Sequence, residues 1–99
     1  MSMAKDQSIL DLVALLELSA HVWTTVDNWE ADFCAVGIAT TSDFRRLVYV
    51  STFDLPPGRY NYECEAPSGP SPEDYATIRS GNNVDFDTLQ EVIEAHLGG

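Results

Sequence analysis

Hydrophobic side chains first recur at helical spacing close to the start of the chain. The stripe consists of Ile9, Leu12, Val13, Leu16 and Ala20. Ser8-Ile9-Leu10-Asp11 fits a capping box at the start of this stripe, so the pattern predicts a helix over residues 9–20. Leu10, Leu15 and Leu18 make the apolar face wider than one sheet surface would cover, which indicates deep burial or self-association.

The pattern then changes to β-branched and aromatic residues separated by polar turns, which is typical of strands. Strands are expected over residues 21–26, 33–40, 44–53 and 60–65. Pro56-Pro57-Gly58-Arg59 has Pro and Gly at the two central positions of a type II turn, so the last two strands should form a hairpin.

A tight hairpin determines which residues of these two strands face each other. Phe53 would lie opposite Tyr62, and Ser51 opposite Cys64. The side expected to face the core carries Leu47, Tyr49, Ser51, Phe53, Leu55, Tyr60, Tyr62 and Cys64. The other side carries Val48, Val50, Thr52, Asp54, Asn61, Glu63 and Glu65.

The C-terminal third begins with a proline-rich loop over residues 66–72. Residues 73–80 fit either a short helical turn or a short strand. Asp85 or Asp87 is expected to cap a final helix. The buried face of that helix should consist of Leu89, Val92, Ile93 and Leu97.

The order of these elements predicts a single domain over residues 1–99 with an α+β fold. We expect an antiparallel four-stranded meander with the N- and C-terminal helices packed on one face, a two-layer sandwich. A hydrophobic content of 44% in 99 residues is sufficient for one packed core.

Charge narrows the possible functions more than any motif does. Sixteen Asp and Glu against five Lys and Arg give a net charge of -11. A protein binds nucleic acids or anionic membranes through its Lys and Arg side chains, so we expect neither as a direct partner. A basic protein is the expected partner, because an acidic surface attracts one over long range. The N-terminus lacks the clean apolar segment of a signal peptide, and no stretch is long and apolar enough to cross a membrane, so we expect a cytoplasmic protein.

Three patterns suggest other chemistry. His21 and Cys34 with a carboxylate would make the site of a small Cys/His enzyme, but no family signature surrounds Cys34, and a buried structural thiol is favoured. Asn83, Asp85, Asp87, Glu91 and Glu94 stand at ligand positions of a calcium loop. Thr88 occupies the position where that loop needs Gly, so helix capping is favoured, and we expect no metal or other cofactor.

The third pattern is the terminal Gly98-Gly99, which resembles the tail of ubiquitin-like modifiers and sulfur carriers. The resemblance covers these two residues alone, and Gly98 is more simply the C-cap of the final helix. The two cysteines, Cys34 and Cys64, are expected to be free thiols in a reducing compartment.

Trp29 lies in a polar turn between the first two strands and is surrounded by carboxylates. An aromatic anchor ringed by charge is typical of a protein-binding hot spot, although Trp29 folded back over the core is the alternative. The expected partner-binding residues are Asp27, Trp29, Glu30, Asp32, Glu63 and Glu65.

The sequence therefore favours a small, acidic, non-catalytic protein-binding module. An immunity or inhibitor protein that neutralises a basic, nucleic-acid-binding partner has this size and charge. The alternatives are a dimeric secretion chaperone or adaptor that associates through its first helix, the small Cys/His enzyme, and the Gly-Gly-tailed carrier protein.

Overall fold

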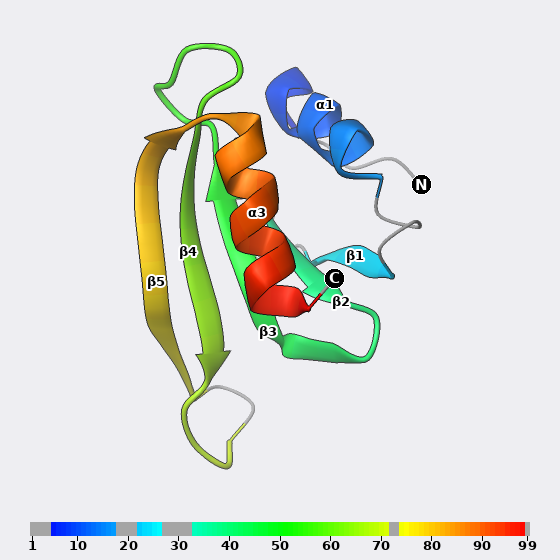
Figure 1. Ribbon diagram of the computed structural model, residues 1–99, viewed down its shortest axis with the longest axis vertical. Helices are drawn as coiled ribbons and strands as arrows, with labels where there is room; N and C mark the ends of the chain where they lie inside the picture. The colour runs from blue at the N-terminus through cyan, green and yellow to red at the C-terminus, as the bar shows by residue number, and fades with distance from the viewer. Residues whose placement is uncertain (1–4, 18–21, 27–32, 72–73, 99) are drawn as a thin grey trace.

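The computed structural model describes residues 5–17, 22–26, 33–71 and 74–98, with the backbone alone described for residues 43–45. Two helices and five strands follow one another along this part of the chain (Figure 1). They are α1 (Gln7–Leu16), β1 (Trp23–Val26), β2 (Ala35–Thr40), β3 (Asp43–Ser51), β4 (Tyr60–Pro67), β5 (Tyr75–Val84) and α3 (Phe86–Leu97).

The five strands form one antiparallel sheet in the order β1-β2-β3-β4-β5, so each strand pairs with its neighbours in sequence. This confirms the α+β fold. The sheet has five strands where four were expected, because the ambiguous segment after the proline-rich loop is a full edge strand. In β5 every residue from Tyr75 to Ser80 is exposed, so the strand lacks the alternation of buried and exposed positions that marks a strand in a sequence.

Side chains from both helices and from the sheet form a single hydrophobic core. α1 contributes Ile9, Leu12 and Leu16, and α3 contributes Leu89, Val92 and Ile93. The sheet contributes Trp23, Val36, Ile38, Val48, Val50, Tyr60, Tyr62 and Cys64. In Figure 1, α3 lies across the middle strands of the sheet and leaves β5 uncovered at the left edge.

The first helix starts earlier than the sequence suggested. Asp6 is its N-cap and accepts a hydrogen bond of 3.0 Å from the backbone N–H of Ser8. Ser8 is therefore inside the helix, and the expected capping box is wrong. Asp11 accepts a hydrogen bond of 2.8 Å from the Gln7 side chain instead. The helix ends at Leu16, where Glu17 adopts a left-handed conformation, so it is shorter than the expected 9–20.

The hairpin register was also wrong, although the turn itself is present. Arg59 N–H donates to Pro56 O at 3.2 Å and Gly58 has φ +79°, as a type II turn requires. A second turn precedes it, closed by Leu55 N–H to Thr52 O at 3.2 Å. The two turns end β3 at Ser51, and Val50 rather than Phe53 lies opposite Tyr62.

This shift by an odd number of residues exchanges the faces of β3. Val48 and Val50 lie in the core, whereas Tyr49 shares a face with Glu63, and Leu47 with Glu65. Phe53, expected in the core, is 70% exposed.

The final helix begins and ends as the sequence indicated. Asp85 is its N-cap and accepts a 2.9 Å hydrogen bond from the backbone N–H of Thr88. Gly98 ends it in a left-handed conformation, with its N–H donating to Glu94 O. Near this C-terminal end, His96 Nε2 donates to Glu65 O, and Arg46 Nε donates to His96 O, both at 2.9 Å. These bonds attach the end of α3 to β3 and β4.

Candidate interaction surface

The regular alternation of β4 separates its polar side chains from the core. Tyr60, Tyr62, Cys64 and Ala66 are buried, while Glu63 is exposed and Glu65 half-buried on the other side of the strand. Cross-strand partners share a face, so Glu63 lies between Tyr49 of β3 and Ser80 of β5. We call this side of β3, β4 and β5 the outer face; its members are Tyr49, Asn61, Glu63, Glu65, Thr77 and Ser80.

The outer face contains a hollow of about 290 Å³ near its centre. The lining residues are Tyr49, Ser51, Asn61, Tyr62, Glu63, Ser80 and Asn82. An aromatic ring, a carboxylate and several hydroxyl and amide groups thus surround one depression. These groups suit a cationic side chain, since a carboxylate pairs with it and a tyrosine ring attracts it by cation–π interaction.

The outer face changes in character across the sheet. Toward β5 it is polar and exposed, and toward β2 it is apolar and buried. On β2 and β3, Ala35, Ala39 and Leu47 point to the same side of the sheet and are at most 1% exposed. On β4 and β5, by contrast, Glu63, Thr77 and Ser80 are all exposed. Among the described residues, the accessible part of the outer face is therefore formed by the last two strands and the neighbouring Tyr49.

The electrostatics of the outer face follow from its two carboxylates. The pKa of Glu65 is raised above its ordinary value, first because burial removes water from the carboxyl group and second because the Glu63 charge repels it. A cation placed here would relieve that repulsion. A positively charged group beside the two glutamates would therefore be stabilised by both carboxylates.

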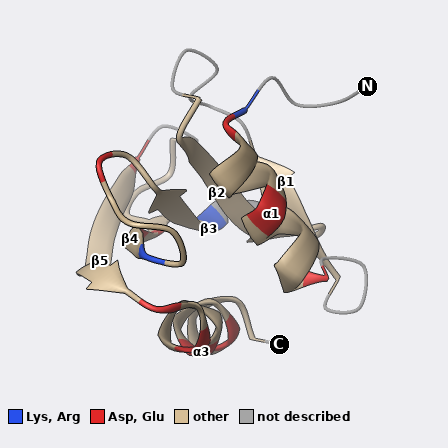
Figure 2. Ribbon diagram, turned by 90° about the horizontal axis from the view of Figure 1, so that it is seen from above, with Lys and Arg blue, Asp and Glu red and all other residues tan. Residues whose placement is uncertain are grey.

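Three of the described basic side chains, Arg46, Arg59 and Arg79, make contacts or occupy strand positions away from Glu63. Arg46 bonds to the end of α3, and Arg59 reaches Asn83 O at 3.4 Å. Arg79 lies opposite Cys64, whose side chain is in the core, so Arg79 is on the other side of the sheet from Glu63. Figure 2 shows acidic positions recurring along both helices, while the few basic positions are scattered.

Of the six residues expected to bind a partner, the structure places Glu63 and Glu65 together on one surface, as the alternation in β4 indicated. Asp27, Trp29, Glu30 and Asp32 lie outside the described residues. Sequence analysis missed Tyr49, Thr77 and Ser80, because the first was assigned to the core by the wrong register and the others belong to the unexpected fifth strand.

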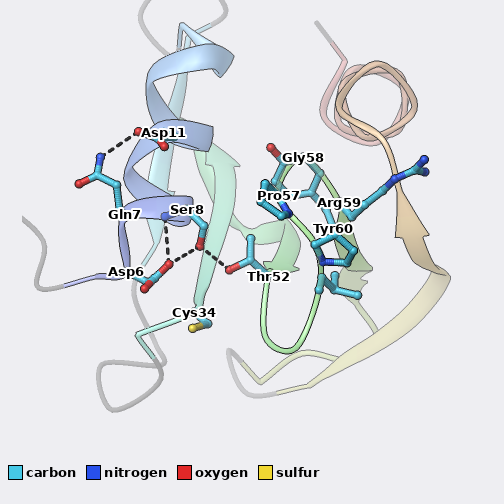
Figure 3. A pocket seen from close by; sticks show the side chains of 12 residues that line it. Asp6, Gln7, Ser8, Asp11, Cys34, Thr52, Pro57, Gly58, Arg59 and Tyr60 are labelled. Carbon is cyan, nitrogen blue, oxygen red and sulfur yellow. Dashed lines mark hydrogen bonds between the residues drawn. The ribbon is translucent and has the colours of Figure 1, made fainter.

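A second cavity, of about 380 Å³, lies between the start of α1 and the loop that joins β3 to β4 (Figure 3). Ser8 Oγ donates to Asp6 Oδ2 at 2.6 Å and accepts from Thr52 Oγ1 at 2.7 Å, which fastens the helix to the loop. In Figure 3, Cys34 lies below the side chains of Ser8, Asp6 and Thr52. The side chain of Arg59 points away from these three residues. Nothing in the sequence indicates this cavity, because its walls come from three separate segments.

The chemistry of this cavity favours a structural role. The Ser8 hydroxyl and backbone N–H both donate to Asp6 and lower the pKa of its carboxyl group. A carboxylate with a lowered pKa is a poor proton acceptor, and none of the residues lining the cavity is a histidine. Asp6 is therefore poorly suited to act as a general base for these hydroxyls.

Cys34 and Cys64 are two separate thiols with no disulfide between them. Cys64 is buried, and burial raises the pKa of its thiol, an effect that Arg79 and Arg46 partly offset. Cys64 is thus a poor nucleophile near neutral pH. Cys34 is half-buried in the cavity beside α1, and its suggested partner His21 lies outside the described residues.

The carboxylates at the start of α3 act as helix residues. Asp85 caps the helix, and Glu91 and Glu94 lie within the helix rather than in a loop. Within the described ranges, no three His, Cys, Asp or Glu side chains are grouped closely enough to hold a metal ion. No helix among these residues has the length and apolar character needed to cross a membrane.

Comparisons of the chain with protein-family models, curated proteins and solved structures found no match in any of the three.

Proposed function

We propose that this protein is a small acidic binding module that neutralises a basic protein in the cytoplasm, as an immunity or inhibitor protein does, without catalysis. We further propose a two-layer arrangement in which both helices pack on one face of the sheet and the outer face is left for the partner. The observation that supports the proposal is that Glu63 and Glu65 lie on the same face of β4 beside an aromatic-lined hollow, with Arg46 and Arg79 directed elsewhere.

Recognition would proceed in two stages. The net charge of -11 attracts a basic surface over about one Debye length, roughly 8 Å at physiological ionic strength. A Lys or Arg side chain of the partner then enters the hollow, where it contacts the Glu63 carboxylate and the ring of Tyr49. A partner that normally grips phosphate with such side chains would be blocked from its nucleic acid.

The decisive experiment compares two charge reversals of equal size. Glu63→Lys/Glu65→Lys changes the outer face, and Glu91→Lys/Glu94→Lys changes the exposed side of α3 by the same net charge. The partner is first captured from native lysate and identified, and association and dissociation rates are then measured by stopped flow at several salt concentrations.

Both variants should slow association, because both reduce the long-range attraction. The outer-face variant alone should also speed dissociation by about tenfold or more, since it removes the short-range contacts. Equal dissociation rates for the two variants, an association rate insensitive to salt, or a captured partner with an acidic contact surface would each contradict the proposal.

The expected hot spot at Trp29 is tested in the same assay. Trp29→Ala should chiefly raise the dissociation rate if the ring is an anchor, whereas reversal of Asp27, Glu30 and Asp32 should chiefly slow association.

The alternative of a dimeric secretion chaperone or adaptor draws on the surface of α1. Leu15 is 55% exposed on this helix, whereas Ile9, Leu12 and Leu16 are fully buried. A dimer through α1 should be lost in Leu15→Glu and kept in Glu63→Lys/Glu65→Lys, as measured by sedimentation equilibrium.

A further inference from the structure

β5 is an edge strand of the sheet, and no other strand of the described residues lies along the side of β5 opposite to β4. It pairs with β4 alone, and no backbone hydrogen bond from the described residues reaches its other side. An edge strand of this kind offers a row of N–H and C=O groups to any extended chain that can pair with it. Figure 1 shows it as the yellow strand at the left, away from both helices.

The side chains of β5 leave this edge open to a partner. Every residue from Tyr75 to Ser80 is exposed, and Tyr75 and Ile78 are large apolar groups that are 41% and 56% exposed. The strand from Tyr75 to Val84 contains no proline and no acidic residue, and Arg79 is its one charged side chain. It is thus an uncharged stripe, apart from Arg79, in a strongly acidic protein.

We propose that β5 accepts an added strand from the basic partner, an extended segment in which Lys or Arg alternates with smaller residues. This inference rests on the proposed function and specifies how the partner docks. Side chains alternate along a strand, so every second residue of the segment would point to the outer face. There Thr77 and Ser80 are small, and Glu65 and Glu63 are their partners on β4.

The geometry brings the opposite charges within range. An added strand would lie two strand spacings from β4, or about 9–10 Å. Side chains as long as Lys and Arg extend across the small residues of β5 toward the glutamates, and the remaining gap is shorter than the Debye length of about 8 Å. Tyr75, which shares the outer face with Pro67, supplies an apolar contact at one end of the segment.

Charge also argues against a second copy of this chain as the occupant. Two copies paired through β5 would carry a combined excess of negative charge and would place two pairs of glutamates beside one joint edge. The register shift at Ile78 further divides the edge into short stretches, Tyr75–Thr77 and Arg79–Gly81. Such a bulge opposes open-ended stacking of edges and fits a single short segment.

The test uses a synthetic seven-residue peptide in which lysine and threonine alternate. The control is the same peptide with its backbone nitrogens methylated. Methylation keeps the charges and removes the backbone N–H groups that would donate hydrogen bonds to β5. Binding to the full-length protein is measured by calorimetry, and exchange of the β5 amide protons is followed by NMR.

The unmodified peptide should slow the exchange of alternate amides between Tyr75 and Gly81 and should bind about tenfold or more tightly than the methylated one, because several hydrogen bonds distinguish them. Ile78→Lys should weaken its binding by about the same factor, since a lysine on an edge strand opposes pairing. Phe53→Lys, at an exposed site in the loop between β3 and β4, is the matched control and should have no such effect.

Equal binding of the two peptides, without protection of β5, would overturn strand addition while leaving the acidic outer face as a binding site. Undiminished binding of the unmodified peptide to Glu63→Lys/Glu65→Lys would overturn the acidic recognition on which both proposals rest. A stable homodimer with β5 amides protected before any peptide is added would show that a second copy occupies the edge, and would also overturn the inference.

Discussion

Tyr62 and Glu63 are neighbours in β4, yet they face different environments. Tyr62 is 6% exposed and packs in the core, while Glu63 is exposed on the outer face. The core face is filled by side chains from both helices, so a change of volume there must be absorbed by close-packed neighbours. The outer face is polar and in part open, so its side chains are free to serve binding. We therefore expect substitutions on the core face to change stability and substitutions on the outer face to change partner affinity.

Ile93→Ala is expected to have the largest effect on stability. Ile93 is fully buried on α3, and truncation of such a residue leaves a cavity that costs about 2–5 kcal/mol. Denaturant unfolding monitored by circular dichroism measures the change. Glu91→Ala on the exposed side of the same helix is the control, and a comparable loss in both variants would mean that the core face does not control stability.

Gly81→Ala should come next, because the ring of Tyr62 crosses the backbone of β5 at this glycine. A Cβ at position 81 would lie 2.5 Å from Tyr62 Cε1, so the core residue or the strand has to move. We expect a loss of about 1–3 kcal/mol, as for other overpacked positions. Measured in the same unfolding assay, Gly81→Ala/Tyr62→Leu should lose less than the sum of the two single variants, since the shorter side chain removes the clash. Strict additivity would contradict this explanation.

Asp85→Ala should have a smaller, pH-dependent effect at the junction of β5 and α3. The backbone N–H of Thr88, and then its hydroxyl, lower the pKa of Asp85 in the folded protein. A carboxyl group with a lowered folded pKa stabilises the fold above its ordinary pKa, and this contribution is lost as the pH falls through the folded pKa. Thermal unfolding should show Asp85→Ala to be less stable than the wild type at neutral pH and nearly equal to it in acid. Asp85→Asn, which keeps the cap without the titration, should stay close to the wild type at neutral pH.

Glu65→Gln tests the outer face and should have the smallest effect, of opposite sign. Burial and then repulsion by Glu63 raise the pKa of Glu65, so the folded protein holds this proton more tightly than the unfolded chain does. Stability from this group is therefore lost as the pH rises from the ordinary carboxyl value through the raised folded pKa. The variant should gain in melting temperature relative to the wild type across that window. Glu91→Gln, on exposed α3, should show no such gain, and a loss of stability in Glu65→Gln near neutral pH would contradict the assigned cause.

The contrast between the faces also explains which parts of the fold the sequence could predict. Alternation in β4 and the apolar stripe of α3 follow from burial on one side, and the structure confirms both. β5 has exposed residues on both sides for most of its length, and Gly81-Asn82-Asn83 resembles a break, so its sequence left a short strand and a short helical turn equally open. An edge strand such as β5 forms because its backbone pairs with the neighbouring strand. Sequence periodicity does not show this pairing.

The hairpin shows how a correct local prediction led to a wrong pairing. The turn at Pro56–Arg59 is determined by Pro and Gly, which restrict the backbone directly. The second turn contains Asp54 with φ +58°, a conformation that few side chains other than Gly, Asn and Asp adopt readily. Because that turn was not anticipated, Tyr49 was assigned to the core, and the aromatic part of the hollow on the outer face was missed.

The sequential order of the strands has a consequence for how the chain folds. Each strand pairs with the strand before or after it in sequence, so the sheet can be assembled as a series of hairpins that close short loops. By contrast, α1 and α3, from the two ends of the described residues, must come together over a long sequence separation to complete the core. Hairpin formation is a microsecond event, whereas long-range contacts slow folding. The docking of the terminal helices is therefore the step that should set the folding rate.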